Sequence, residues 1–182
     1  MLRLLAFALL TLAAPARAAL DDATAIMRLV AAHEARIHET AGAHRACVLP
    51  ETVAAAPAME AARAQRCMRP SAPPSAASTG NVPLPPEEAR ALSEAAAAMG
   101  RSGAPVPRPA RVDPAWLPGF AFCAADRSGP VLGFSAPAVG GDMAFVETGF
   151  TCGGLCGNGL LYALRRGPGG WAIVAIARTW IS

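Results

Sequence analysis

Residues 160–181 read LLYALRRGPGGWAIVAIARTWI, and this stretch decides the fold that the sequence predicts. The turn Gly167-Pro168-Gly169-Gly170 separates two runs that are mostly aliphatic and aromatic. Two such runs joined by a short Gly-rich turn are typical of a β-hairpin. We therefore expect antiparallel strands over Leu160–Arg166 and Trp171–Ile181.

Three further short apolar runs precede the hairpin, and Gly-rich turns divide them: Phe120–Ala124, Val131–Ser135 and Met143–Phe150. Sequential short strands with short connections favour an antiparallel meander, here of four to five strands. Both faces of the last strand are mostly apolar, with Trp171 and Ile173 on one and Val174 and Ile176 on the other. A strand of this kind is expected inside the sheet, with helices covering one face.

Helices are expected mainly in the first half of the chain. Asp21 or Asp22 can cap a helix that runs to about Arg45. Its apolar stripe at helical spacing contains Ile26, Leu29, Val30, His33 and Ile37. A second, weaker helix fits 58–68. Pro85-Pro86-Glu87-Glu88 opens a third that runs through Met99, with Gly100 placed to end it. The predicted fold class is α+β, with N-terminal helices packed on the C-terminal antiparallel β-meander.

Four regions follow from this pattern. Residues 1–18 are the predicted signal peptide and 19–69 a helical segment, while 70–118 are a Pro- and Ala-rich linker with one short helix. The antiparallel β-sheet region occupies 119–182.

The start of the chain has the three parts of a signal peptide in order. Arg3 gives a short positive region, the apolar run from Leu4 to Ala14 follows, and Ala16 and Ala18 form a small-x-small cleavage site. The run is too short to span a bilayer, which takes about 20 residues. We expect cleavage after Ala18 and a protein that is periplasmic or secreted, with no membrane span after cleavage.

The charge of the chain excludes several functions. Cleavage would remove Arg3 and Arg17 and lower the formal net charge from +3 to +1. The sequence also shows no basic face that would indicate nucleic-acid binding. The chain has no lysine, since its basic residues are all arginine. Chemistry that needs a lysine, such as a Schiff base or a phosphate-binding loop, is therefore excluded.

The most distinctive segment is Thr151-Cys152-Gly153-Gly154-Leu155-Cys156-Gly157-Asn158-Gly159. Together with the strand that follows, the Gly turn, Trp171 and the terminal Trp180-Ile181-Ser182, it resembles a pattern of uncharacterised exported bacterial proteins: Cys-Gly-x-Leu-Cys-Gly-x-Gly, then Trp, then Trp-Ile-Ser. The resemblance covers roughly residues 131–182. It implies a shared fold and an extracytoplasmic setting, and it brings no known activity.

Cys152 and Cys156 are the favoured disulfide candidates. In a continuous strand their Cα atoms would lie about 13 Å apart, and a disulfide needs about 7 Å or less. The chain must therefore turn back, and Gly153, Gly154, Gly157 and Gly159 can supply positive φ angles for this. A redox pair or a soft-metal site is the alternative, although the spacing is not that of Cys-x-x-Cys oxidoreductases and no His follows to complete a zinc site.

The remaining cysteines are Cys47, Cys67 and Cys123, and the total of five leaves at least one outside any intrachain bridge. A Cys47–Cys67 bridge would join the first two predicted helices, and this pairing is tentative.

No catalytic constellation emerges from the sequence. His33 and His38 are five residues apart, about 140° around a helix, so they do not suit a shared metal, and His44 does not complete a set. Ser135 has Pro137 where a nucleophile elbow needs Gly. Glu147 is expected to face outward, toward Arg165 or Arg178 across the sheet.

Asp142 and Glu147 are the only acids near the strand-rich loops, and nothing pairs them. Trp171, Trp180 and Tyr162 are expected to pack in the core rather than to line a groove. No cofactor or metal is predicted.

Two functions remain open. The first is a non-enzymatic envelope or secreted domain that binds an unknown protein partner or small ligand and has a disulfide-closed loop between two strands. The alternative is a thiol-active periplasmic redox protein that uses Cys152 and Cys156.

Overall fold

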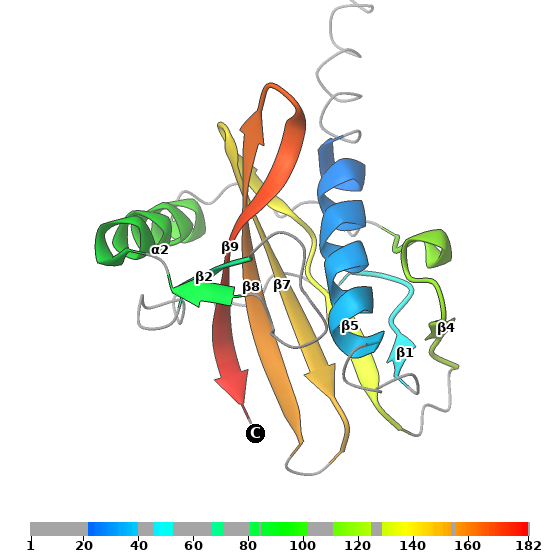
Figure 1. The fold of residues 1–182 in the computed structure, drawn as a ribbon. Coiled ribbons are helices and arrows are strands. Elements are labelled where there is room, and N and C mark those ends of the chain that lie inside the picture. The colour runs from blue at the N-terminus through cyan, green and yellow to red at the C-terminus, as the bar shows by residue number, and fades with distance from the viewer. Residues whose placement is uncertain are drawn as a thin grey trace, which may run out of the picture.

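The computed structural model describes residues 22–39, 46–52, 67–70, 81–83, 85–101, 111–124, 129–153 and 156–181. The predicted signal peptide, its cleavage site after Ala18 and most of the predicted second helix lie outside these ranges. In Figure 1 the sheet lies between the helix of residues 22–39 and that of residues 86–101. None of the helices in the described part of the chain has both the length and the hydropathy of a membrane-spanning segment.

The described chain alternates short strands with two α-helices before a run of longer strands. The first helix occupies residues 22–39. The further elements are β1 (Cys47–Val48), β2 (Cys67–Pro70), β3 (Asn81–Pro83), α2 (Pro86–Arg101), the 3₁₀ helix η2 (Pro114–Trp116), β4 (Ala121–Phe122), β5 (Val131–Phe134), β6 (Ala138–Gly140), β7 (Met143–Thr151), β8 (Gly157–Gly167) and β9 (Gly170–Ile181).

These strands form one nine-stranded mixed sheet, so the predicted fold of helices on an antiparallel meander of four to five strands is wrong. The strand order is β3-β2-β9-β8-β7-β5-β1-β4, and β6 pairs with β7 outside this path. β1 runs parallel to both β4 and β5, while the other pairings are antiparallel. The N-terminal half therefore supplies strands to both ends of the sheet.

The short strands replace predicted helix and linker. Cys67 and Met68, expected at the end of a helix, belong to β2, which pairs with β9. Asn81–Pro83, inside the predicted linker, forms β3 and pairs with β2. These segments gain their backbone hydrogen bonds from distant strands, which outweighs their weak local preference. The helix expected to open at Pro85-Pro86 and to run through Met99 is present as α2, which begins at Pro86 and extends to Arg101.

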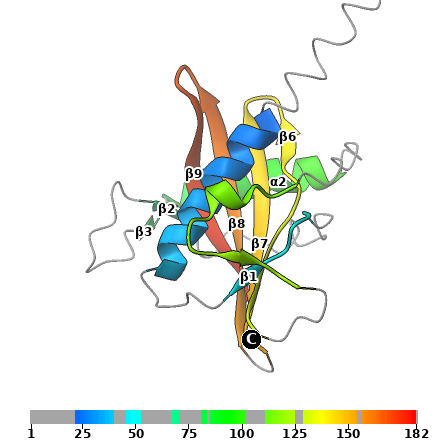
Figure 2. The ribbon, with the colours of Figure 1, turned by 90° about the vertical axis from the view of Figure 1, so that its right-hand side faces the viewer.

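The larger core lies between the first helix and the sheet, and Figure 2 shows this helix in front of β7 and β8. Ile26, Met27 and Val30 are fully buried there against strand residues such as Phe134 and Tyr162. The buried stripe is rotated from the predicted one. Ile37, expected in the stripe, is exposed, while Glu34 and His38 are buried. The helix therefore brings polar side chains into an apolar interface.

The opposite face of the sheet is covered by α2 (Figure 1). Ala89 of α2 is buried in a second cluster with Met143 and Phe145 of β7 and with Ala175 and Ala177 of β9. Both faces of the central strands are thus buried. This agrees with the apolar character of β9, which lies between β8 and β2.

A β-bulge at Val174 changes which residues of β9 share a face. Ala163 pairs with Ala175, and Leu164 pairs with Ile173, so Val174 has no partner on β8. An extra residue of this kind breaks the alternation of side chains along a strand. Ile173 and Ile176 consequently pack on the first helix's side, whereas Val174 and Ala175 pack on the other. A strict two-residue period had placed Val174 and Ile176 together.

The start of the first helix is attached to the β8–β9 hairpin. Asp22 accepts a hydrogen bond from Nε1 of Trp171 at 3.0 Å, and its second carboxylate oxygen pairs with Arg166. The Arg166 guanidinium lies 4.7 Å from the centre of the Trp171 ring. These contacts join the start of the first helix to the end of β8 and the start of β9.

Candidate functional site

Glu34 is a buried carboxylate between the first helix and the sheet, with 2% of its surface exposed. Its Oε1 accepts hydrogen bonds from the hydroxyl of Thr148 on β7 at 2.5 Å and from that of Tyr162 on β8 at 2.9 Å. Its Oε2 lies 3.4 Å from Nε2 of His38, one helical turn further along. Two hydroxyl donors and one His ring nitrogen thus surround the carboxylate, and the hydrogen bonds from the hydroxyls offset the cost of burying it.

His33 extends this arrangement toward the surface. Its Nδ1 lies 3.1 Å from the Tyr162 hydroxyl oxygen. A Tyr hydroxyl has one hydrogen, and here it is donated to Glu34, so Nδ1 of His33 must be the donor in its bond to Tyr162. The bonds therefore run in one direction, from half-buried His33 through Tyr162 to Glu34. We call His33, Glu34, His38, Thr148 and Tyr162 the Glu34 network.

Burial shifts the pKa of two members of the network, Tyr162 and His33. It raises the pKa of the Tyr162 hydroxyl well above the ordinary value of 10.0, and the nearby negative charge of Glu34 acts in the same direction. Burial lowers the pKa of His33 below its ordinary value of 6.5, although Glu34 opposes the shift. Near neutral pH Tyr162 is therefore a hydrogen-bond donor rather than a phenolate. This arrangement stabilises the helix–sheet contact.

The histidines occupy separate places in the network. His38 packs beside Phe150, with ring centres 4.8 Å apart, and edge-on to Phe120 at 6.0 Å. His33 meets the edge of the Tyr162 ring at 5.4 Å. Within the described ranges no three or more His, Cys, Asp or Glu side chains are placed to hold a metal. His44 lies outside those ranges.

Glu34 is the residue that sequence reasoning missed. It stands four residues before His38, the spacing at which two side chains share a helix face, and that was the available signal. The partners Thr148 and Tyr162 are more than 100 residues away, since they follow Glu34 by 114 and 128 positions. Only the packing of the helix on β7 and β8 brings them together.

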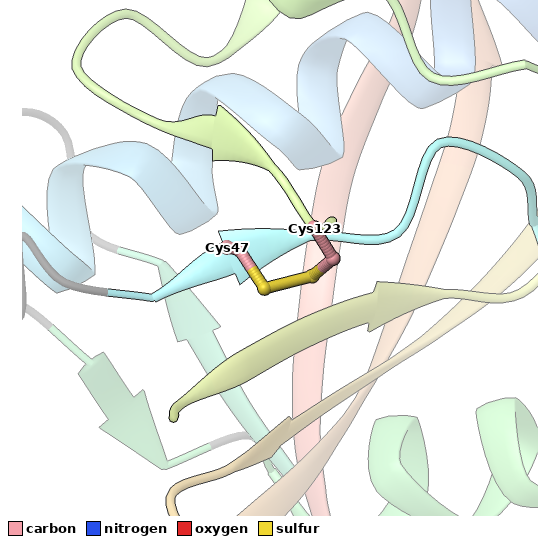
Figure 3. The surroundings of a disulfide bond; sticks show 2 residues. All are labelled: Cys47 and Cys123. Atoms are coloured by element: carbon pink, nitrogen blue, oxygen red, sulfur yellow. A yellow bond between two sulfur atoms is a disulfide. The ribbon is translucent and has the colours of Figure 1, made fainter. Parts of the chain in front are cut away.

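The first disulfide joins Cys47 to Cys123, so the tentative prediction of a Cys47–Cys67 bridge is wrong. Figure 3 shows Cys47 on β1 bonded to Cys123, which follows β4. Their Cα atoms lie 4.7 Å apart although 76 positions separate them in sequence. Cys67 lies on β2, at the other end of the strand order from β1, so β9, β8, β7 and β5 intervene.

The second disulfide joins Cys152 and Cys156, with Cα atoms 5.2 Å apart, in agreement with the small loop expected there. The chain turns at Gly153, which has a φ of 89°. The amide of Cys152 donates to the carbonyl of Cys156 at 2.9 Å, and the amide of Cys156 donates to that of Gly153 at 3.2 Å. Gly157 and Gly159, also expected in the turn, belong to β8 instead.

The two disulfides constrain the unfolded chain to different extents. In the chain-entropy description, a loop of the size closed by Cys47–Cys123 gives about 4.5 kcal/mol and one as small as Cys152–Cys156 about 2 kcal/mol. The Cys47–Cys123 bond therefore stabilises the end of the sheet formed by β1 and β4, whereas the Cys152–Cys156 bond acts locally at the turn between β7 and β8.

Ser135 follows β5 and has a structural role beside β7. Its amide donates to the carbonyl of Glu147 at 2.7 Å, and its Oγ accepts from the Glu147 amide at 2.8 Å and donates to the carbonyl of Ala136 at 3.2 Å. The hydroxyl is buried and occupied by backbone groups. This arrangement gives no support to a nucleophilic role.

Glu147 lies half-buried on the α2 side of the sheet. Its Oε1 accepts a hydrogen bond from Oγ1 of Thr179 at 3.3 Å, rather than meeting Arg165 or Arg178. Burial raises the pKa of Glu147 above its ordinary value of 4.5, and the Thr179 hydrogen bond opposes this. The other predicted acid, Asp142, contributes its backbone carbonyl to the amide of Arg166 at 2.8 Å.

Comparisons of the chain with protein families, curated proteins and solved structures found no match. The functional argument therefore rests on the Glu34 network and on the two disulfides.

Proposed function

We propose that this chain is an exported, non-enzymatic domain that two disulfides stabilise and that acts by binding another macromolecule outside the cytoplasm. The pair of disulfides is the observation that carries the proposal, because such bonds form and persist in oxidising compartments. The apolar start of the chain, with its small-x-small site at Ala16 and Ala18, supports the same compartment.

Binding rather than catalysis is supported by how the reactive side chains are used. The carboxylate of Glu34 accepts hydrogen bonds from two hydroxyls and lies beside the His38 ring, and the hydroxyl of Ser135 is bound to backbone groups. Apolar clusters fill both faces of the central strands, so the chain favours a partner on its surface over a small ligand in the sheet. Phe122 and Val139 are exposed apolar residues from which contact can be tested.

Export is tested by interrupting the apolar run. Leu9→Arg together with Leu10→Arg should leave the protein uncleaved inside the cell, while Leu9→Val with Leu10→Val should be exported and cleaved like the original chain. N-terminal sequencing of fractionated cells gives the readout. Export of the arginine variant would contradict the proposal.

Binding is tested with a photo-crosslinking amino acid placed at Phe122 or Val139 in living cells, because the absence of lysine removes the usual side-chain amine chemistry. We expect a discrete light-dependent adduct with another macromolecule. Absence of an adduct from both positions, in protein that is exported and folded, contradicts binding through these surfaces.

The thiol-active alternative stays a prediction, and an insulin-reduction assay separates it from the binding function. Catalytic turnover of insulin that Cys156→Ser abolishes would replace the proposal with the redox function, whereas stoichiometric opening and closing of the Cys152–Cys156 bond without turnover is compatible with binding.

A further inference from the structure

The Cys152–Cys156 bond lies at the turn between β7 and β8, the two long strands that Figure 1 shows side by side. Cys156 is exposed, whereas Cys152, Cys47 and Cys123 are each half-buried. An incoming thiolate must approach a disulfide sulfur in line with the bond, so access selects which sulfur is attacked. Exposure makes Cys156 the accessible end of this bond.

The backbone holds the two cysteines together without help from the sulfur atoms. The hydrogen bonds from Cys152 to the carbonyl of Cys156 and from Cys156 to that of Gly153 close the turn. Directly beside it, Thr151 pairs with Gly157 as the last pair of a ladder that continues along both strands. These hydrogen bonds do not involve the sulfur atoms, so we expect them to persist when the disulfide opens and to keep the two thiols close enough to close again.

We propose that Cys152 and Cys156 form a reversible dithiol–disulfide couple that exchanges electrons with a dithiol, while Cys47–Cys123 remains a permanent bond. This activity goes beyond binding and does not depend on it. The difference between the bonds follows from access, because Cys156 is exposed, whereas Cys47 and Cys123 are both half-buried. Losing the Cys47–Cys123 bond also costs the protein more stability, because that bond closes a separation of 76 residues and Cys152–Cys156 one of four.

The exchange proceeds in two balanced steps. A thiolate of the dithiol attacks Sγ of Cys156, the Cys152–Cys156 bond breaks, and Sγ of Cys152 leaves as a thiolate that takes a proton from solvent. The second thiolate of the reagent then attacks its own sulfur in the mixed disulfide, which releases Cys156 as a thiol. Two electrons and two protons pass to the protein, and the dithiol becomes a disulfide. An oxidised dithiol reverses the steps.

The test is a titration of the folded, oxidised chain with dithiothreitol. Thiols freed in the native state are alkylated with a light reagent and the others, after unfolding and full reduction, with a heavy one. Trypsin cleaves after arginine, so Cys47, Cys123 and the Cys152/Cys156 pair fall in three different peptides. Because Cys156 is the exposed cysteine, we expect light label on Cys152 and Cys156 at a dithiothreitol concentration lower by about tenfold or more than that which labels Cys47 and Cys123. Simultaneous labelling of all four, or earlier labelling of Cys47 and Cys123, overturns the proposal.

Two single variants test the role of Cys156 separately. Cys152→Ser leaves the Cys156 thiol free, and Cys156→Ser leaves the Cys152 thiol free, with the same remaining cysteines in both. An aromatic disulfide reagent should react faster with the Cys152→Ser variant, because its free thiol is the exposed one. Equal rates, or a faster Cys156→Ser variant, overturn the assignment of Cys156 as the attacked sulfur. Either failure leaves the export and photo-crosslinking results untouched.

Discussion

The hydroxyl of Tyr162 on β8 donates a hydrogen bond to the carboxylate of Glu34 on the first helix across 2.9 Å, inside the larger core. Both residues are buried, so the bond replaces solvation that each side chain loses on folding. It joins parts of the chain that are 128 positions apart and defines how the helix sits on the sheet.

Tyr162 provides a direct optical test, because it is the only tyrosine in the chain. Burial raises its pKa, so the native protein should show no phenolate absorbance as the pH passes 10.0, whereas protein unfolded in guanidinium should show it there. The protonated form is favoured by folding. Its contribution to stability is therefore complete below pH 10.0 and is lost as pH rises through the native pKa. Ionisation of native Tyr162 near pH 10.0 would contradict the buried network.

Replacing Glu34 should destabilise the protein strongly. Glu34→Ala removes the oxygen that accepts from the hydroxyls of Thr148 and Tyr162, and it also removes the carboxylate beside the His38 ring. We expect the free energy of unfolding to fall by about 3 kcal/mol or more. Glu34→Gln keeps one acceptor oxygen and should lose less. The exposed Glu39 on the same helix gives the control Glu39→Gln, which should stay within about 0.5 kcal/mol. Urea unfolding measures all three, and equal effects at both positions would refute the role of Glu34.

His33 should make the protein less stable in mild acid. Its folded pKa is lowered by burial, so its contribution is present above pH 6.5 and is lost as pH falls through 6.5 toward the native value, where the unfolded chain gains a proton first. His33→Gln keeps a donor for Tyr162 and removes this titration. Urea midpoints at several values between pH 7.5 and 5.5 should therefore fall less steeply in the variant. If the urea midpoint fell equally with pH in the original protein and in the variant, His33 would not be the source of the acid sensitivity.

The contribution of Glu147 to stability should change with pH in the opposite direction to that of His33. Because burial raises its pKa, its effect on stability is most favourable below pH 4.5 and is lost as pH rises through the native value. Glu147→Gln keeps an acceptor for Thr179 and carries no charge, so it should raise the thermal midpoint at neutral pH and lose that advantage in acid. Differential scanning calorimetry at pH 7 and at pH 4 measures this. A lower midpoint at neutral pH would show that the charge is needed.

The two disulfides should differ in their effect on stability. Replacing Cys47 and Cys123 together by serine should cost about 4.5 kcal/mol, whereas replacing Cys152 and Cys156 should cost about 2 kcal/mol. Urea unfolding of the two double variants compares them directly. A larger loss for the Cys152 and Cys156 variant would contradict the loop-size argument.

The C-terminal strands were predictable because their signals are local. Gly167–Gly170 marks the turn between β8 and β9, and the apolar runs before it match β5 and β7. The bulge at Val174 was not visible, since an extra residue in a strand leaves no signature in an apolar run. The sequence therefore located the strands but misassigned side chains beyond the bulge.

The remainder of the fold depends on contacts between distant segments. β1 is two residues long, and it becomes a strand because β4 and β5 pair with its two edges. That same pairing brings Cys47 beside Cys123, a partner that no spacing rule indicates. The Glu34 network depends equally on tertiary packing, because its acceptor lies on the helix and two of its donors lie on β7 and β8.

The central claim, an exported chain held by two disulfides, is tested most directly by mass spectrometry of protein recovered from cells under conditions that trap thiols. We predict a chain that begins at Ala19, carries the Cys47–Cys123 and Cys152–Cys156 bridges, and takes up alkylating reagent only at Cys67. A chain that retains Met1 and is alkylated at all of its cysteines would contradict the account.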